Sequence, residues 1–324
     1  MEKLYLGIEI GATKQQIAVG TGDGVLLKVI QEKIPLHRGA QDILDWLTVK
    51  IPVLLEADEF RGRVKALSAG FGGPLETATG RIISSIQVPG WENFELKNWL
   101  TKNFSLPAVV TNDTVTGGYA ELYLGCGKDE RNMFYTNIGS GIGGVLFINR
   151  RYYDGSGCGA AYLGCSYIPD WTADVPGMEC RVEKICCGFG ISARLQQPGY
   201  VSSDSVIMRM CGGDSLRITP KMLEDAGNEG DAFALAEIDR IARSFSVGLC
   251  NVLTLTAPEL IVIGGGLAKM GDLLLNPIRR HTEQLAFVAN RGRFRIEKSR
   301  LLDDAVICGA IICAAKSGIR SAGA

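Results

Sequence analysis

Three glycine-bearing turns stand at the ends of predicted strands and could hold phosphate groups. They are Gly11-Ala12-Thr13-Lys14, Gly139-Ser140-Gly141-Ile142-Gly143-Gly144 and Gly264-Gly265-Gly266. Because glycine has no Cβ, its N–H can approach an anion closely, and successive N–H groups form concave nests for phosphate. A single glycine turn is more often part of a plain hairpin. Three such turns, two of them in matching strand–turn–strand segments, favour phosphate binding.

Neither of the familiar phosphate-binding motifs fits these turns. A P-loop requires Gly-Lys-Ser/Thr at the start of a helix, whereas Lys14 follows Thr13 and leads into a predicted strand. A Rossmann fingerprint requires a helix after its glycines, whereas Gly144 leads into the apolar run 145–148. The turns therefore fit hairpins that hold phosphates between two lobes.

Asn112 and Asp113 follow a predicted buried strand and open a predicted helix. Both residue types are strongly favoured at helix N-caps, which is a purely structural role. Asp113 would also lie at the carboxyl end of a strand, where α/β sheets place their ligands. There a carboxylate could accept a proton from a substrate hydroxyl, as the catalytic aspartate of a kinase does. The two roles are compatible.

The hydrophobic pattern predicts the elements that position these residues. Strands are expected at 4–10, 16–19, 25–30, 64–69, 108–111, 133–138, 143–148 and 260–263. Helices are expected at 41–55 (ended or kinked by Pro52), 95–103, 113–124, 235–252 and 303–316. The segments around Gly11 and Gly139 are both strand, glycine turn and strand. This internal repeat suggests two related domains.

Composition excludes several classes of protein. A chain of 324 residues suggests about two domains. With 46% hydrophobic and 21% charged residues, the chain can bury a full hydrophobic core. Its formal net charge of −1 provides no excess of basic residues for binding nucleic acid. The longest apolar stretch, 305–315, is too short to cross a bilayer. Since Met1-Glu2-Lys3 leads directly into a strand, we expect no signal peptide and a cytoplasmic protein with no membrane partner.

The ten cysteines and two histidines do not form a recognisable metal motif. Five cysteines fall between Cys158 and Cys187, yet no CxxC pair occurs, and two histidines exclude a multi-histidine site. Several cysteines lie in apolar helical runs, where a free thiol packs as a small hydrophobe. We expect reduced, packed cysteines, with a metal or redox role for the central cluster as the alternative.

In this order, these residues resemble the ROK family (repressor, open reading frame, kinase) of sugar kinases and sugar-responsive regulators, over nearly the whole chain. The segments 7–14, 139–144 and 264–266 are similar to its two phosphate motifs and its adenosine-side motif. The resemblance implies an α/β, actin-like ATPase (ribonuclease H-like) fold with a cleft between two lobes. The N-terminal lobe would be 1–115 joined by the C-terminal helix 303–318, and the C-terminal lobe 116–302.

The resemblance also implies roles for individual residues. Asp113 would be the catalytic base. The sugar would be bound by Asn112, Gly73, Glu183, Tyr162 and Cys165. The nucleotide and its phosphates would be bound by Glu9, Gly11, Ala12, Thr13, Gly139, Ser140, Gly141, Gly143, Gly264, Gly265 and Gly266. ATP and Mg²⁺ would be the cofactors, with Glu9 acting through the metal, and the family suggests a homodimer.

The chain departs from the family pattern at two places. Where family kinases have Gly-Glu-Ile-Gly-His, whose Glu and His hold sugar hydroxyls, this chain has Ala161-Tyr162-Leu163-Gly164-Cys165. Many members bind a structural zinc ion through that His and three cysteines, and those three positions are here Asp174, Pro176 and Arg181. The sequence therefore predicts no structural zinc site. Because two polar sugar contacts are replaced, it also predicts an altered choice of sugar.

Two functions follow from this pattern. The first is an ATP- and Mg²⁺-dependent carbohydrate kinase in which Asp113 deprotonates a primary hydroxyl, that on C6 of a hexose. The second is a catalytically degenerate sugar-binding or regulator-like protein without a DNA-binding domain. Retention of Asp113 and of all three glycine turns favours the enzyme, whereas Tyr162 and Cys165 favour the degenerate protein.

Overall fold

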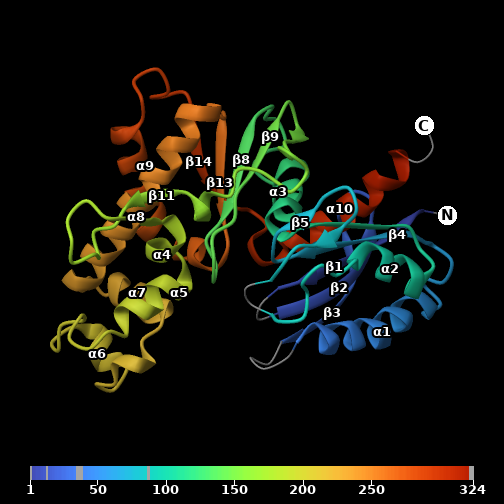
Figure 1. The fold of residues 1–324 in the computed structure, drawn as a ribbon, viewed down its shortest axis with the longest axis horizontal. Coiled ribbons are helices and arrows are strands. Elements are labelled where there is room, and N and C mark those ends of the chain that lie inside the picture. The colour runs from blue at the N-terminus through green and yellow to red at the C-terminus, as the bar shows by residue number, and fades with distance from the viewer. Residues whose placement is uncertain (1, 12–13, 34–38, 86–87, 321–324) are drawn as a thin grey trace. The chain divides into compact units, whose positions relative to one another are not determined.

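The computed structural model describes residues 2–11, 14–33, 39–85 and 88–320. It forms two compact units (Figure 1). The first unit comprises Met1–Asp129, Val145–Ala160 and Asp303–Ala324, and the second comprises Glu130–Gly144 and Ala161–Leu302.

The first unit is built on a five-stranded sheet in the order β3-β2-β1-β4-β7. Its strands are β1 (Leu4–Ile10), β2 (Lys14–Thr21), β3 (Leu26–Lys33), β4 (Val64–Phe71) and β7 (Ala108–Asn112). β1, β2 and β3 pair antiparallel, whereas β1, β4 and β7 run parallel. The carboxyl ends of β1, β4 and β7 therefore meet at one edge of the sheet.

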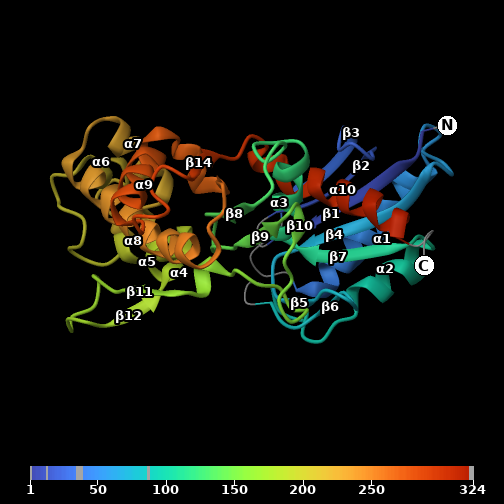
Figure 2. The same cartoon turned by 90° about the horizontal axis from the view of Figure 1, so that it is seen from above.

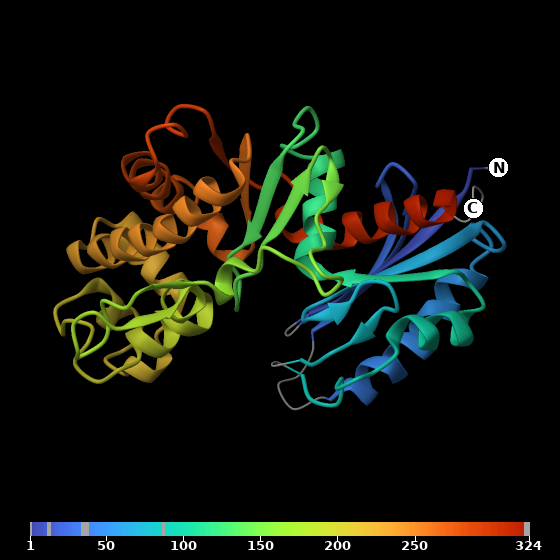
Figure 3. The same cartoon turned by 45° about the horizontal axis from the view of Figure 1, so that its top comes forward.

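Helices cover both faces of this sheet. As Figure 3 shows, α3 (Asp113–Tyr123) and α10 (Ala305–Arg320) lie on one face, and α1 (Ala40–Glu56) and α2 (Leu96–Phe104) lie on the other. Helices α3 and α10 approach so closely that a Cβ at Gly309 would lie 1.8 Å from the carbonyl oxygen of Thr116. Only glycine allows this contact between the two helix backbones.

Four short strands complete the first unit. They are β5 (Leu75–Glu76) paired with β6 (Arg81–Ile82), and β9 (Val145–Ile148) paired with β10 (Arg151–Tyr152). Phe147 of β9 packs edge-on against Tyr119 of α3, with ring centroids 5.0 Å apart. Asp154, just after β10, accepts a hydrogen bond from the hydroxyl of Thr77 at 2.9 Å. These contacts tie the segment 145–160 to the N-terminal part of the chain.

The second unit contains a parallel sheet covered by long helices. In it β13 (Leu260–Gly264) lies between β8 (Met133–Asn137) and β14 (Arg295–Lys298). The amphipathic helix α8 (Ala232–Thr256) packs against α9 (Asp272–Leu285). Its apolar side, which includes Ile238, Ile241, Phe245 and Leu249, is buried. This is the period-3.6 stripe that the sequence predicts.

The remaining elements of the second unit are short. They are η1 (Leu163–Cys165), β11 (Tyr167–Pro169), β12 (Glu179–Arg181), α4 (Val182–Cys186), α5 (Gly188–Leu195), α6 (Val206–Met210), η2 (Ser215–Arg217), α7 (Pro220–Asn228) and η3 (Gly266–Met270). β11 and β12 form an antiparallel hairpin at the edge of the unit (Figure 2). A last short turn, η4 (Leu302–Asp304), precedes α10.

Most predicted elements agree with the structure in type and in position. Of the two effects expected of Pro52, the end of the helix is wrong, because α1 continues to Glu56, and the kink stays a prediction. The compact units also differ in extent from the predicted lobes, since the first one keeps residues 116–129 and 145–160. The assignment of 1–115 and 116–302 as separate domains stays a prediction. Among the described residues, no helix has the length and apolar character needed to span a bilayer.

Candidate functional site

Asp113 lies where the parallel strands of the first unit end. Asn112 is the N-cap of α3, and its Oδ1 accepts a hydrogen bond from the N–H of Thr114 at 3.0 Å, so the predicted capping role is confirmed. Oδ1 of Asp113 accepts from the same N–H at 2.6 Å and from the Thr114 hydroxyl at 3.3 Å. The protein atoms around the carboxylate desolvate it and raise its pKa to about 6, although the bonds from Thr114 oppose the shift.

The second oxygen of Asp113 faces the ends of the neighbouring strands. A Cβ built on Gly72 would lie 3.4 Å from Oδ2 of Asp113 and 3.6 Å from the carbonyl oxygen of Ile10. Residues from the ends of β1, β4 and β7 therefore meet around this oxygen. With Oδ1 occupied by Thr114, Oδ2 is the atom on which Asp113 could receive a proton.

Glu9 brings a second carboxylate to this edge of the sheet. It is directly paired with Gln16 across β1 and β2, and the Gln16 amide donates to its Oε2. The Nζ of Lys14 lies 3.3 Å from the same oxygen. Burial raises the pKa of Glu9, Lys14 and Gln16 lower it, and the charge of Asp113 raises it further. The two carboxylates are thus close enough to influence each other.

Asn112 and Gly73, both predicted to bind sugar, are in direct contact. The Nδ2 of Asn112 donates to the carbonyl oxygens of Gly73, at 3.1 Å, and of Phe71, at 3.4 Å. The Asn112 amide therefore fixes the loop after β4. Nearby, the N–H of Gly11 donates to the carbonyl oxygen of Lys14 at 3.1 Å and closes the first glycine turn. Ala12 and Thr13, predicted to bind phosphate, lie outside the described residues.

In the second unit the other two glycine segments lie side by side. The N–H of Ile138 donates to the carbonyl oxygen of Gly264 at 2.9 Å, and the carbonyl oxygen of Ile138 accepts from Leu267 at 3.0 Å. Gly265 fits between these bonds with φ +85°, and a Cβ there would lie 2.6 Å from the Ile138 oxygen. The predicted phosphate turn and the predicted adenosine-side segment, which includes Gly266, are therefore neighbours.

Parts of the 139–144 turn are held by bonds within the turn. The N–H of Gly139 donates to the carbonyl oxygen of Gly141 at 2.9 Å, and the N–H of Gly143 donates to Oδ1 of Asn137 at 2.8 Å. The carbonyl oxygens of Gly139 and Ser140 accept from the N–H groups of Gly188 and Phe189, at 2.8 and 3.3 Å. The start of α5 thereby contacts this turn.

The three predicted sugar-side residues of the second unit also lie near one another. The N–H of Cys165 donates to the carbonyl oxygen of Tyr162 at 3.0 Å. Burial raises the pKa of the Cys165 thiol, and the charge of Glu183 raises it further. The N–H of Val182 donates to the carbonyl oxygen of Ser166 at 2.9 Å, so the adjacent residues Glu183 and Cys165 lie close together. Glu183 itself lies 3.9 Å from the guanidinium of Arg181. A Cβ on Gly164 would lie 2.2 Å from the carbonyl oxygen of Ile142, so this group borders the 139–144 turn.

Sequence reasoning assigned no site role to four residues that contact or border the two carboxylates of the first unit. These are Lys14, Gln16, Gly72 and Thr114. Gln16 could have been found by pairing the two strands across the Gly11 turn, which sets it opposite Glu9. The sequence offers no comparable sign that the flexible Lys14 side chain reaches Glu9.

The candidate metal ligands are few. Within the described residues, no group of three or more His, Cys, Asp or Glu side chains could hold a metal ion. All ten cysteines are free thiols. A Mg²⁺ ion bound with substrate phosphates needs only one or two protein carboxylates, and Glu9 could supply one.

Comparison with known proteins places the chain in a family. The sequence profile of the ROK family matches residues 5–317. A glucokinase of Halalkalibacterium halodurans is 30% identical over 95% of this chain and 94% of its own. A xylose repressor of Caldicellulosiruptor bescii is 23% identical over 94% of this chain and 76% of its own.

A solved structure shares the fold. It is that of a ROK family glucokinase from Streptomyces griseus in complex with glucose and AMPPNP, with a TM-score of 0.81, 23% identity, and coverage of 97% of this chain and 99% of that one. The predicted actin-like α/β fold is confirmed by this match. Together with the profile that spans nearly all of the sequence, it leads to one conclusion: the chain belongs to the ROK family.

Proposed function

We propose that this protein is a carbohydrate kinase that transfers the γ-phosphoryl group of ATP to a sugar. The acceptor is the hydroxyl group on C6 of a hexose. The observation that carries the proposal is the Asp113 carboxylate at the ends of three strands, with a pKa of about 6. The relationship to glucokinases, including the Halalkalibacterium halodurans protein, supports the reaction class. The Streptomyces griseus structure, which holds glucose and AMPPNP, supports a sugar and ATP as substrates.

Asp113 would act as the general base. At neutral pH its carboxylate is ionised, and its raised pKa makes it a stronger proton acceptor than an ordinary aspartate. The sugar hydroxyl oxygen forms a bond to the γ-phosphorus, the bond from that phosphorus to the bridging oxygen breaks, and ADP leaves. The hydroxyl proton goes to Oδ2 of Asp113, since Oδ1 is held by Thr114.

Glu9 fits the oxygen ligands that Mg²⁺ prefers. Its carboxylate is largely buried, it borders Asp113, and the Lys14 charge favours its ionised form. Glu9 would hold the ion together with phosphate oxygens of the nucleotide. When bound, the ion supplies positive charge that offsets the negative charge developing on the transferred group.

The other predicted residues would bind the substrates. In the second unit, N–H groups of the segments 139–144 and 264–266 would hold the nucleotide and its phosphates, as would the Gly11 turn in the first. Asn112, Gly73 and Glu183 would contact the sugar. Tyr162 and Cys165 would alter which hydroxyls are recognised, so we expect a sugar preference different from that of glucose kinases with polar residues there.

The second candidate is a sugar-binding regulator without catalysis. It is favoured by the relationship to a xylose repressor and by Tyr162 and Cys165 in place of polar sugar contacts. The cytoplasmic location stays a prediction from the sequence, and the homodimer stays a prediction from the family resemblance.

The deciding experiment measures ATP consumption with Mg²⁺ over glucose, mannose, N-acetylglucosamine and fructose. The wild type is compared with Asp113→Asn and with Asp58→Asn, a change of an exposed aspartate in the same unit. We expect turnover on one sugar that Asp113→Asn abolishes and Asp58→Asn preserves. Sugar binding by calorimetry without any turnover would reject the kinase and favour the regulator.

A further inference from the structure

The helix that carries Glu183, α4, is too short to be stable without contacts to other segments. Helix α4 has five residues, and a single turn fixes many backbone angles in return for very few hydrogen bonds. Its place in the second unit must therefore come from contacts with other segments. Four of its residues make such contacts, through the pairs Val182–Ser166, Lys184–Asp170, Ile185–Arg194 and Cys186–Ile241. The fifth residue is Glu183.

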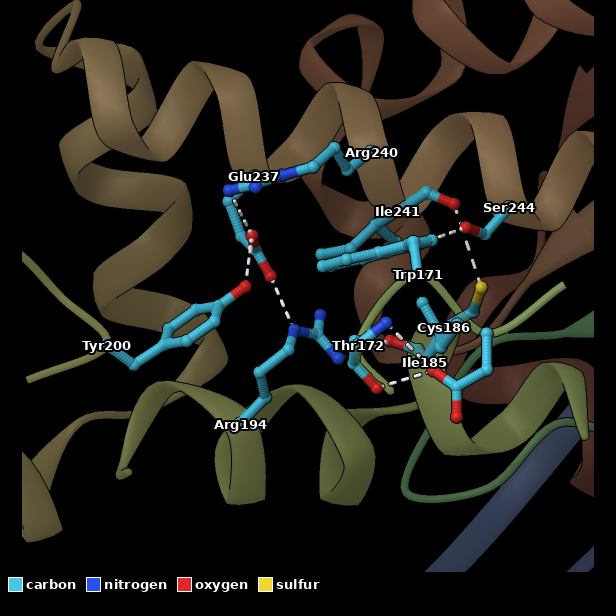
Figure 4. A network of polar contacts seen from close by, with 11 residues as sticks. Trp171, Thr172, Ile185, Cys186, Arg194, Tyr200, Glu237, Arg240, Ile241 and Ser244 are labelled. Carbon is cyan, nitrogen blue, oxygen red and sulfur yellow. Dashed lines mark hydrogen bonds and ion pairs between the residues drawn. The ribbon is translucent and has the colours of Figure 1, made fainter. Parts of the chain in front are cut away.

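Arg194 makes one of the buried contacts that hold α4. Its side chain is 5% exposed and extends from α5 toward α8 (Figure 4). Its Nη1 donates to the carbonyl oxygen of Ile185 at 3.1 Å, and its Nε donates to Oε1 of Glu237 at 2.7 Å. The guanidinium also lies 5.1 Å from the ring centroid of Trp171. One rigid group thus joins α4 to α5, to α8 and to the segment after β11.

Glu237 holds this guanidinium in one orientation. Its carboxylate is fully buried on α8 and receives three donors (Figure 4). Oε1 accepts from Arg194, while Oε2 accepts from the hydroxyl of Tyr200 at 2.9 Å and lies 3.0 Å from Arg240. A planar guanidinium can serve Glu237 and Ile185 at once because its donors diverge in a fixed fork. A lysine at this position carries all its donors on one nitrogen, so it lacks the fork that separates the two bonds.

Arg240 provides a natural control for Arg194. It contacts the same Glu237, and its guanidinium lies at the same 5.1 Å from the Trp171 ring. Its side chain is 47% exposed, and within the described residues no hydrogen bond joins it to α4. The two arginines therefore share their acidic and aromatic partners and differ in burial and in the bond to Ile185.

We propose that Arg194 is a positioning residue for sugar recognition. Its guanidinium, oriented by Glu237, holds α4 through the Ile185 carbonyl and thereby sets the place of the Glu183 carboxylate. Lys184 supports the same helix from its exposed side, through Asp170 at 2.6 Å. This inference rests on the proposed function, because the contact of Glu183 with sugar belongs to it.

The test compares Arg194→Lys with Arg240→Lys. Three quantities are measured: the Kd of the sugar by calorimetry over the same four sugars, the KM values for the bound sugar and for ATP, and hydrogen exchange of amides 182–187. For Arg194→Lys we expect the sugar Kd and KM to rise about tenfold, with faster exchange in α4 and an ATP KM within about twofold of the wild type. Arg240→Lys should leave all three unchanged.

A double-substitution cycle tests the link to Glu183. Glu183→Gln should weaken sugar binding, and adding Arg194→Lys to it should weaken binding no further, because the carboxylate being positioned is gone. Independent, additive losses would overturn the inference. An unchanged sugar Kd in Arg194→Lys, or an equal loss in Arg240→Lys, would overturn it as well.

Two outcomes separate this inference from the proposed function. If the wild type binds a sugar but does not turn over, the kinase proposal fails while the Kd comparison still decides the role of Arg194. If none of the four sugars binds the wild type, both fail. If Arg194→Lys does not fold, Lys184→Met replaces it. This change removes the ion pair with Asp170 at a side chain that is 58% exposed. An unchanged sugar Kd in Lys184→Met would reject the idea that the contacts of α4 with other segments position Glu183.

Discussion

The ammonium group of Lys14 lies 3.3 Å from Oε2 of Glu9 and donates to the carbonyl oxygen of Asp303, also at 3.3 Å. Lys14 thus joins the first glycine turn to the segment before α10. It also counteracts the burial that raises the pKa of Glu9. The positive charge favours the ionised form of this desolvated carboxylate, which is the form that binds Mg²⁺.

Glu9→Gln should therefore weaken the binding of Mg²⁺ that activity requires. We expect the half-saturating Mg²⁺ concentration to rise at least about tenfold, because the amide keeps the size of the side chain and loses its charge. The measurement is a Mg²⁺ titration of the initial rate at fixed ATP. Glu59→Gln, at an exposed position of the same unit, is the control. Superimposable Mg²⁺ titrations of Glu9→Gln and the wild type would exclude Glu9 as a Mg²⁺ ligand.

The pH dependence of the rate should report Asp113. Only the carboxylate can accept the hydroxyl proton, and its pKa is about 6. The value of kcat/KM for the sugar should be level above pH 7 and fall about tenfold per pH unit below pH 6. A profile measured from pH 5 to 8.5, with protein stability checked at each pH, tests this. A rate that stays level down to pH 5 would contradict the assignment of Asp113 as the base.

The raised pKa of Asp113 should also affect stability. The folded-state pKa exceeds the ordinary value of 3.8, so the folded state binds the proton more tightly than the unfolded state does. Stability is then lost as the pH rises from about 4 to 6 and stays lowered above that range. Asp113→Asn, which cannot ionise, should raise the free energy of unfolding at pH 7.5 by about 1–3 kcal/mol, with no gain at pH 4.

Urea denaturation at pH 7.5 and pH 4 measures this difference directly. Asp58→Asn, which changes an exposed carboxylate, should have no effect at either pH. If Asp113→Asn were less stable than the wild type at pH 7.5, the carboxylate would contribute to folding through its bonds with Thr114, and the desolvation argument would fail.

Removal of metal should leave the fold intact. The family resemblance predicts that the four zinc-ligand positions are occupied here by Cys165, Asp174, Pro176 and Arg181, and hence that no structural zinc ion is bound. We expect EDTA to leave the Tm unchanged and elemental analysis to find no stoichiometric zinc. Bound zinc together with a lower Tm in EDTA would indicate that the cysteines of the segment 158–187 form a metal site of another kind.

Much of the fold could be predicted because local patterns determine it. The stripe of α8, the strand–turn–strand segment around Gly11 and the N-cap at Asn112 all depend on neighbours within a few residues. Helix α1 shows the limit of local rules, since its buried face, which includes Ile51 and Leu54, keeps the chain helical past Pro52. Tertiary packing outweighed the cost of one missing hydrogen bond.

The site could be predicted only in part, because its polar contacts join residues far apart in the sequence. Asp113 was identified by its type and by its place after a strand, and Glu9 by the family resemblance. The Lys14–Glu9 contact, in contrast, depends on the conformation of a flexible side chain. The pair Arg194–Glu237 spans 43 residues and two helices, and neither residue belongs to a motif. Such contacts follow from how the helices pack, which no local pattern specifies.

Two adjacent glycines allow folding and nucleotide binding to be separated. Gly265 has φ +85° and leaves no room for a Cβ beside Ile138, whereas a Cβ on Gly266 meets no atom within 4 Å. Gly265→Ala should lower the free energy of unfolding by about 2 kcal/mol or more, through backbone strain and the clash. Gly266→Ala should leave stability unchanged or slightly raised.

For ATP binding, in contrast to stability, we expect the substitution at Gly266 to have the clear effect. If the open space at Gly266 admits the nucleotide, a methyl group there should raise the KM for ATP several-fold while the Tm and the sugar Kd stay the same. Thermal melts and ATP titrations of both variants decide the matter. A Gly266→Ala protein with the wild-type KM for ATP would mean that the nucleotide does not approach this backbone, and the assignment of segment 264–266 to nucleotide binding would have to be abandoned.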